Sequence, residues 1–186
     1  MLWFVWLIII LAVLIAIAFF VYYNRFAVLS NRIDNSLSQI DVQLKRRADL
    51  IPNLIETVKG YAKHETAAIK SVTEARKALV GAKGFEGKIK ADQKLEGALG
   101  KLFAIAEGYP DLKANTNFLE LQRELASTED KVAYSRQFYN DSILSYENMR
   151  TTFPGNFFAN LYGRKKKEFF EVTSPKEREV VKVKFD

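Results

Sequence analysis

Residues 1–24 read MLWFVWLIIILAVLIAIAFFVYYN, and this stretch contains no charged side chain. A helix of about 20 apolar residues, rising about 1.5 Å per residue, is long enough to cross the hydrocarbon core of a bilayer. We therefore expect a transmembrane anchor at residues 1–24. The alternative is a cleaved signal peptide, with Ala16-Ile17-Ala18 as its cleavage site. The anchor is favoured because no Lys or Arg precedes the apolar run and because the run exceeds the length of a signal-peptide core.

The orientation of the anchor follows from the basic residues near its ends. None precedes the apolar run, whereas five follow it: Arg25, Arg32, Lys45, Arg46 and Arg47. Since basic residues stay on the cytoplasmic side, we expect the N-terminus outside and the remaining chain in the cytoplasm. Aromatic residues at both ends fit interfacial belts: Trp3 and Trp6, then Tyr22, Tyr23 and Phe26.

The rest of the chain is long enough for one domain, and we assign residues 25–171 to a helical domain and residues 172–186 to a charged tail. The net charge of +6 favours anionic partners. The nearest such surface is the membrane, with its anionic headgroups. No nucleic-acid-binding motif is recognisable, so nucleic acid is not expected as a partner. The absence of cysteine is compatible with a reducing compartment.

Apolar residues recur at helical spacing almost throughout the domain, which predicts an all-α fold. The rows are Leu29, Ile33, Leu37, Ile40 and Leu44, resumed at Ile51, Leu54, Ile55 and Val58; Ala68, Val72, Ala75 and Leu79; Ala91, Leu95, Ala98, Leu102 and Ile105; and Phe118, Leu121, Leu125, Val132, Tyr139, Ile143 and Tyr146. The anchor is expected to continue into the first of these helices, with Pro52 either kinking or breaking it. Short connections predict an antiparallel up-down four-helix bundle with long first and fourth helices.

These unequal lengths predict a membrane-proximal region made of the first and fourth helices alone. Its apolar surface would lack cover within the chain, and exposed apolar patches mark interaction sites. We therefore expect lateral, coiled-coil-like self-association into a homo-oligomer.

In the tail, Val181, Val183 and Phe185 alternate with lysines in a strand-like pattern.

Aromatic and basic residues follow the end of the fourth helix at Phe153-Pro154-Gly155. On return to the bilayer, they would form a membrane-interface site against anionic headgroups. Its residues are Phe157, Phe158, Leu161, Tyr162, Arg164, Lys165, Lys166 and Lys167. The alternative is that the aromatic side chains pack on the bundle and the basic run is merely solvated.

A second candidate site surrounds the arginine pair Arg46-Arg47. It contains Arg46, Arg47, Asp49, Pro52, Asn53, Glu107 and Asp111. Glu107, Asp111, Glu124 and Glu129 are possible partners for the arginines from other helices. The cluster is either a set of polar ties that fixes helix register or a docking surface for a partner.

Several segments resemble the LemA family of bacterial membrane-anchored proteins. The likeness is carried by RRADLIPNL at residues 46–54, ETVKGYA at 56–62, YPDLKAN at 109–115 and Phe153-Pro154. It implies an N-terminal anchor in the bacterial inner membrane, an external N-terminus and a cytosolic helical bundle. It implies no enzymatic activity. By analogy, it suggests a membrane metalloprotease as a partner.

The residue inventory argues against catalysis. The chain has one histidine, His64, and no H-E-x-x-H, phosphate-loop or dinucleotide motif. The carboxylates Glu120, Glu124, Glu129 and Asp130 are interpreted as a solvated helix face. We expect no cofactor and a non-enzymatic, single-pass membrane scaffold. The alternatives are an adaptor or regulator that binds one partner, such as a membrane metalloprotease, and an enzyme.

Overall fold

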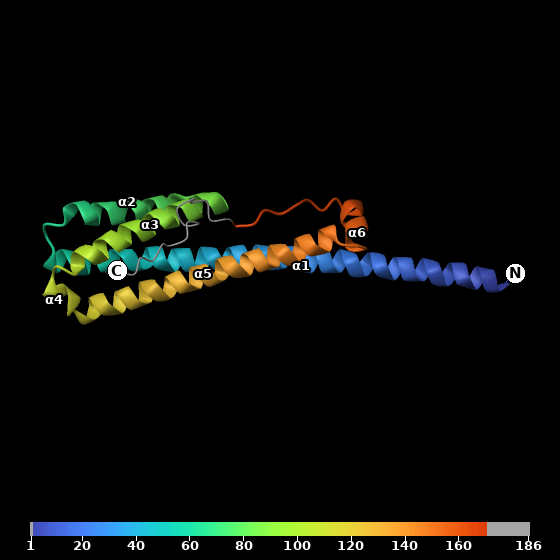
Figure 1. Ribbon diagram of the computed structural model, residues 1–186, viewed down its shortest axis with the longest axis horizontal. Helices are drawn as coiled ribbons and strands as arrows, with labels where there is room; N and C mark the ends of the chain where they lie inside the picture. The colour runs from blue at the N-terminus through green and yellow to red at the C-terminus, as the bar shows by residue number, and fades with distance from the viewer. Residues whose placement is uncertain (1, 171–186) are drawn as a thin grey trace, which may run out of the picture. The chain divides into compact units, whose positions relative to one another are not determined.

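A computed structural model describes residues 2–170, and every regular element in that range is a helix (Figure 1). The prediction of an all-α fold is thereby confirmed. The helices are α1 (Leu2–Tyr61), α2 (Thr66–Gly81), α3 (Gly84–Ala106), α4 (Pro110–Lys113), α5 (Thr116–Thr151) and α6 (Gly155–Leu161). The expected charged tail, 172–186, and its alternating Val181, Val183 and Phe185 lie outside the described residues.

Helix α1 is one uninterrupted helix, so the apolar stretch does continue into the following segment without a break. Pro52 lies inside it and removes the amide that would bond the carbonyl of Ala48, four residues earlier. Arg76 of α2 replaces that donor, because its Nε lies 2.8 Å from the Ala48 carbonyl oxygen. A side chain from a neighbouring helix therefore satisfies the carbonyl that Pro52 leaves open.

The chain divides into two compact units, and α1 and α5 contribute to both. Residues 34–137 form one unit, in which α2 and α3 lie side by side. Most of its core comes from the predicted apolar rows. Ile40, Leu44, Val72, Leu79, Leu95, Leu102, Phe118, Leu125 and Val132 are all buried. The periodicity of the sequence was sufficient to identify this core because each helix has one apolar face.

Two helix boundaries in this unit have clear chemical causes. Asn115 caps α5, since its Oδ1 accepts a hydrogen bond from the amide of Phe118 over 3.0 Å. Pro110 begins α4, a helix of four residues, because a proline is tolerated at the first position of a helix.

The other unit contains residues 1–33 and 138–186, of which 2–33 and 138–170 are described. Phe26 and Ile33 of α1 and Tyr139, Ile143 and Tyr146 of α5 are buried in it. The segment after α6 runs along α5, because Tyr146 Oη donates to the Lys165 carbonyl and Asn140 exchanges two hydrogen bonds with Phe170. The segment after α6 therefore covers part of α5. The prediction from helix lengths, which considered the long helices alone, did not include this cover.

Candidate functional site

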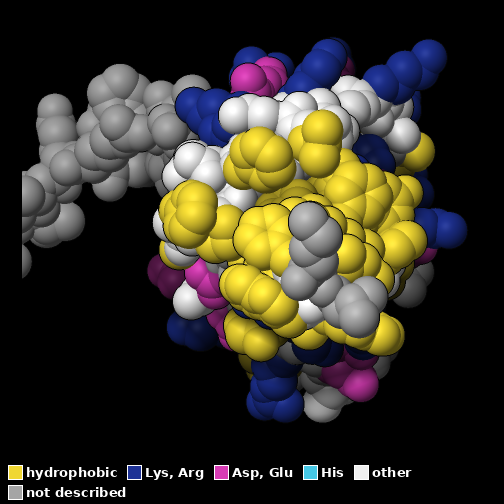
Figure 2. Space-filling model, turned by 90° about the vertical axis from the view of Figure 1, so that its right-hand side faces the viewer, with side chains coloured by type: hydrophobic (Ala, Val, Ile, Leu, Met, Phe, Trp, Pro, Cys, Tyr) yellow, Lys and Arg dark blue, Asp and Glu magenta, His cyan; other side chains and the backbone are white. Residues whose placement is uncertain are grey.

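The first feature is the exposed apolar part of α1. Within residues 2–170, α1 is the one helix long and apolar enough to cross a membrane, and no residue of its most apolar window is buried. Figure 2 looks at the end of the molecule where α1 begins, and hydrophobic side chains fill the middle of this view. Apolar side chains without protein cover need another apolar environment, and a bilayer provides one.

Helix α6 packs against the last turns of this apolar part (Figure 1). The ring of Phe158 stacks on that of Tyr22, with ring centroids 4.6 Å apart and planes 9° from parallel. Tyr162 contacts the rings of Phe19 and Tyr23 edge-on, at centroid distances of 5.1 and 5.6 Å. Its hydroxyl also donates a 2.6 Å hydrogen bond to the carbonyl of Phe19. The predicted interface segment is therefore held against the end of the apolar stretch.

The close turn between α5 and α6 depends on Gly155. This residue is buried, and a Cβ built on it would lie 2.1 Å from the carbonyl oxygen of Met149. Any side chain at this position would collide with that backbone atom. The glycine therefore lets the chain turn tightly at the end of α5 before α6 begins.

The predicted membrane-interface residues divide into two groups in the structure. Phe158 is buried and Tyr162 half-buried on α1, as in the packing interpretation. Phe157 and Leu161 remain 63% and 58% exposed, which leaves their apolar surface available for another partner. The structure therefore packs Phe158 and Tyr162 on α1 and leaves Phe157 and Leu161 exposed, so contact of these two with a bilayer stays a prediction.

The basic residues that follow α6 are similarly divided. The guanidinium carbon of Arg164 lies 5.8 Å from the ring centroid of Tyr23 and 5.9 Å from that of Phe26, within cation–π range. Lys165 and Lys166 are exposed. Lys167 is half-buried, and its amide donates a 2.7 Å hydrogen bond to Glu147 Oε1.

Glu147 fastens this basic segment to α5. Its carboxylate also accepts a hydrogen bond from Arg150 Nε over 2.8 Å. Burial by itself would raise the pKa of Glu147, but the hydrogen bonds from Arg150 and from the Lys167 amide together lower it. The carboxylate is therefore held in its ionised form, which is the form that accepts both hydrogen bonds.

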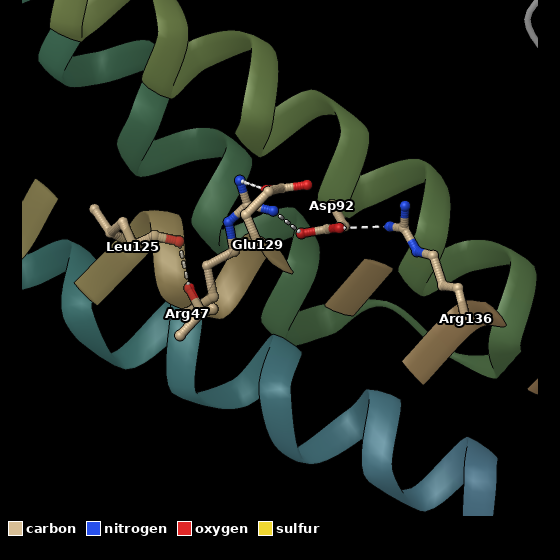
Figure 3. A network of polar contacts seen from close by, with 6 residues as sticks. Arg47, Asp92, Leu125, Glu129 and Arg136 are labelled. Atoms are coloured by element: carbon tan, nitrogen blue, oxygen red, sulfur yellow. Dashed lines mark hydrogen bonds and ion pairs between the residues drawn. The ribbon is translucent and has the colours of Figure 1, made fainter. Parts of the chain in front are cut away.

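The second feature is a polar network inside the 34–137 unit (Figure 3). Asp92 of α3 lies between two arginines: its Oδ1 is 2.9 Å from Arg47 Nη1, and its Oδ2 is 2.7 Å from Arg136 Nη2. Arg47 Nη2 also lies 2.5 Å from Glu129 Oε2. The Arg47 and Asp92 side chains are only 4% and 0% exposed. The network thus joins α1, α3 and α5 around the buried side chains of Arg47 and Asp92.

Glu129 lies at the half-exposed edge of this network. Burial raises its pKa, and the neighbouring carboxylates of Glu96 and Asp92 act in the same direction, whereas Arg47 and Arg136 lower it. The net shift is upward. At this edge, burial and like charges outweigh the ion pairs.

The predicted arginine cluster is therefore split. Arg47 is buried, whereas the other six members, Arg46, Asp49, Pro52, Asn53, Glu107 and Asp111, are exposed. Of the four acidic residues suggested as partners, Glu129 pairs with Arg47. Asp92 was missed, although the sequence contains a signal for it: Asp92 and Leu95 share an otherwise apolar face of α3. A charge on such a face requires a buried partner.

Metal-binding groups were sought among the same described residues. No group of three or more His, Asp or Glu side chains between residues 2 and 170 could hold a metal ion.

Comparisons with known proteins give the relationships of the chain. It is 25% identical over 175 residues to magnetosome protein MamQ 2 of Paramagnetospirillum magneticum and 26% over 174 residues to MamQ of Magnetospirillum gryphiswaldense. Each match covers 80% of this chain and 64% of the relative, so the chain spans less than two thirds of those proteins. It is 30% identical over 153 residues to protein LemA of Metamycoplasma hominis, covering 78% of this chain and 68% of that protein.

These relatives and the exposed apolar part of α1 support a membrane-associated protein. The LemA family model matches residues 36–185, which is most of the chain. The chain therefore belongs to the LemA family.

Proposed function

We propose that this protein is a non-enzymatic membrane scaffold, anchored by residues 1–24, whose copies associate laterally. The observation that carries the proposal is the continuity of α1: one helix supplies an exposed apolar segment and then core residues, from Phe26 to Val58. In this proposal α1, α2, α3 and α5 form an antiparallel bundle. The network between Arg47, Asp92, Glu129 and Arg136 supports it, because these ion pairs join three of the four helices.

Self-association is proposed along one face of α1. Exposed aliphatic residues recur every seven positions at Leu7, Leu14, Val21 and Val28. That spacing places the side chains along one seam, as in a coiled coil. Val28 matters most because it lies beyond the first charged residue, Arg25, where the apolar anchor alone does not account for it. Its side chain is 64% exposed.

The test is the mass of the full-length protein in a mild detergent, measured by light scattering. We expect a discrete oligomer that Val28→Asp reduces to a smaller species. Val80→Asp is the matched control, because Val80 is 65% exposed but belongs to α2. A wild-type monomer at every concentration would remove the scaffold and leave the adaptor, bound to one partner such as a membrane protease.

The orientation belongs to the same proposal: the N-terminus lies outside the inner membrane and α2 lies in the cytoplasm. The chain has no cysteine, so a single cysteine in a Lys77→Cys variant reports on that position alone. We expect a membrane-impermeant maleimide to label it only after the cells are opened. Labelling in intact cells would reverse the orientation.

A further inference from the structure

Helix α6 has three distinct sides, and one of them is apolar and exposed among the residues that the structure describes. Phe158 and Ala159 are buried, with Phe158 stacked on Tyr22. Asn156 and Asn160, four residues apart, make up an exposed polar side. Phe157 and Leu161, also four residues apart, make up an exposed apolar side. A short helix with a buried, a polar and an apolar side has the pattern of an interfacial helix.

The position of α6 is fixed by its contacts with α1. The bond from the Tyr162 hydroxyl to the Phe19 carbonyl and the ring contact between Phe158 and Tyr22 place α6 beside residues 19–22. Those residues are the last turns of the uncharged stretch. If the stretch crosses a bilayer, this end of it lies at the boundary between acyl chains and headgroups.

Positive charge follows directly after α6. Arg164 is held beside the rings of Tyr23 and Phe26, and Lys165 and Lys166 are exposed next to it. Phosphate is the chemical group that such a cluster binds. A phospholipid is the source that fits, because it combines this anionic group with acyl chains for Phe157 and Leu161. Free phosphate would leave those two side chains without a partner.

We propose that α6 is an interfacial helix that binds the bilayer leaflet at the Phe19–Tyr22 end of the apolar stretch. Phe157 and Leu161 insert among the acyl chains, and Arg164, Lys165 and Lys166 lie against anionic phospholipid headgroups. The inference rests on the proposed membrane crossing of α1. It adds a second, laterally separate contact with the same leaflet, which limits how far the protein tilts or moves along the membrane normal.

The test uses the full chain in nanodiscs of phosphatidylcholine and phosphatidylglycerol, with nitroxide labels on single cysteines. Leu161→Cys and Asn160→Cys are matched neighbours on the two exposed sides of α6, and Phe157→Cys with Asn156→Cys repeats the comparison. The readout is the ratio of accessibility to oxygen, which enters lipid, and to a water-soluble nickel complex. We expect a ratio several-fold higher at 161 than at 160, and at 157 than at 156. Equal, water-like ratios within both pairs would overturn the proposal.

A nitroxide label at Leu11→Cys distinguishes a failure of the interfacial-helix proposal from a failure of the proposed function. If position 11 is in lipid while 157 and 161 are in water, the anchor stands and the interfacial helix is wrong. If position 11 is itself in water, the membrane crossing is wrong, and the proposed function fails with it.

The headgroup part of the proposal is tested by changing the lipid. We expect the label at 161 to lie deeper with phosphatidylglycerol than in pure phosphatidylcholine, and the Lys165→Gln/Lys166→Gln double variant to remove that difference. Inorganic phosphate added to pure phosphatidylcholine nanodiscs should leave the depth unchanged. If free phosphate reproduces the shift, or if the two lipids give the same depth, anionic lipid is not the ligand.

Discussion

Arg76 donates a hydrogen bond from Nε to the carbonyl oxygen of Ala48 over 2.8 Å, and that carbonyl is the one Pro52 leaves without an intrahelical partner. The proline is thus tolerated inside α1, in its C-terminal part, because a cation from α2 supplies the missing donor. A proline inside a helix ordinarily costs about 3 kcal/mol. Here part of that cost is offset across a helix–helix contact.

This relationship predicts coupling between Arg76 and Pro52. A hydrogen bond from a charged donor is worth about 1.5–3 kcal/mol, so Arg76→Met should reduce the free energy of unfolding by that amount. In a Pro52→Ala background the Ala48 carbonyl regains an amide donor, and Arg76→Met should cost at least about 0.5 kcal/mol less. Urea unfolding of the four proteins in a nonionic detergent measures the coupling. Strictly additive effects would contradict it.

A second prediction concerns the buried carboxylate of Asp92. Asp92→Asn keeps the size of the side chain but leaves Arg47 and Arg136 facing a neutral group. Breaking a buried ion pair from one side costs about 3–5 kcal/mol, and we expect a loss of this size in denaturant unfolding. The control is Asp41→Asn, whose pair with Lys88 is 2.6 Å long but largely exposed. It should cost under about 1 kcal/mol.

The third prediction is a pH dependence that begins at Glu147. Its pKa in the folded protein lies below the ordinary 4.5, so the folded state binds this proton less readily than the unfolded state does. The resulting stability is present above pH 4.5 and is lost as the pH falls through the lowered pKa. Glu147→Gln should remove this acid sensitivity. It should also speed hydrogen exchange at the Lys167 amide, which donates to this carboxylate.

Glu129 is a control for that experiment because its pKa is shifted in the opposite direction from that of Glu147. Its pKa is raised above 4.5, chiefly by burial, so the folded state holds the proton more readily than the unfolded state does. Its contribution to stability is present below pH 4.5 and is lost as the pH rises through the raised pKa. Glu129→Gln should therefore flatten the pH dependence above 4.5 and leave exchange at Lys167 unchanged. Glu147 should control the pH dependence of stability below pH 4.5, and Glu129 should control it above pH 4.5. Identical profiles of stability against pH for the two variants would contradict both assignments.

The fourth prediction concerns Gly155. Gly155→Ala places a methyl group against the Met149 carbonyl and must displace either α6 or the end of α5. We expect a loss of about 1–3 kcal/mol, with faster hydrogen exchange in α6. Gly97→Ala is the matched control, since a Cβ at Gly97 meets nothing within 4 Å and Gly97 lies within α3. That substitution should instead stabilise the protein by about 0.5–1 kcal/mol. Equal effects at the two glycines would contradict the close approach at Gly155.

The long helices and most of their buried faces follow from local patterns in the amino-acid sequence. The reason is local: apolar side chains at spacings of three, four and seven residues give each helix one face that must leave water, as Ile40, Leu44 and Ile51 do in α1. The exposed apolar segment, the cap at Asn115 and the end of α5 before Pro154 follow from equally local chemistry.

Which polar groups meet depends on the packing of the helices in three dimensions. The partner of Arg47 is Asp92, 45 residues away, and the partner of the Ala48 carbonyl is Arg76, 28 residues away. Such pairs depend on how two helices are rotated and aligned, and helical periodicity contains no information about that alignment. The same holds for α6, where packing on α1 buried Phe158 and left Phe157 exposed. Phe157 and Phe158 are the same residue type and lie on different sides of α6. Which of the two is buried is therefore determined by the surface of α1 that the helix contacts.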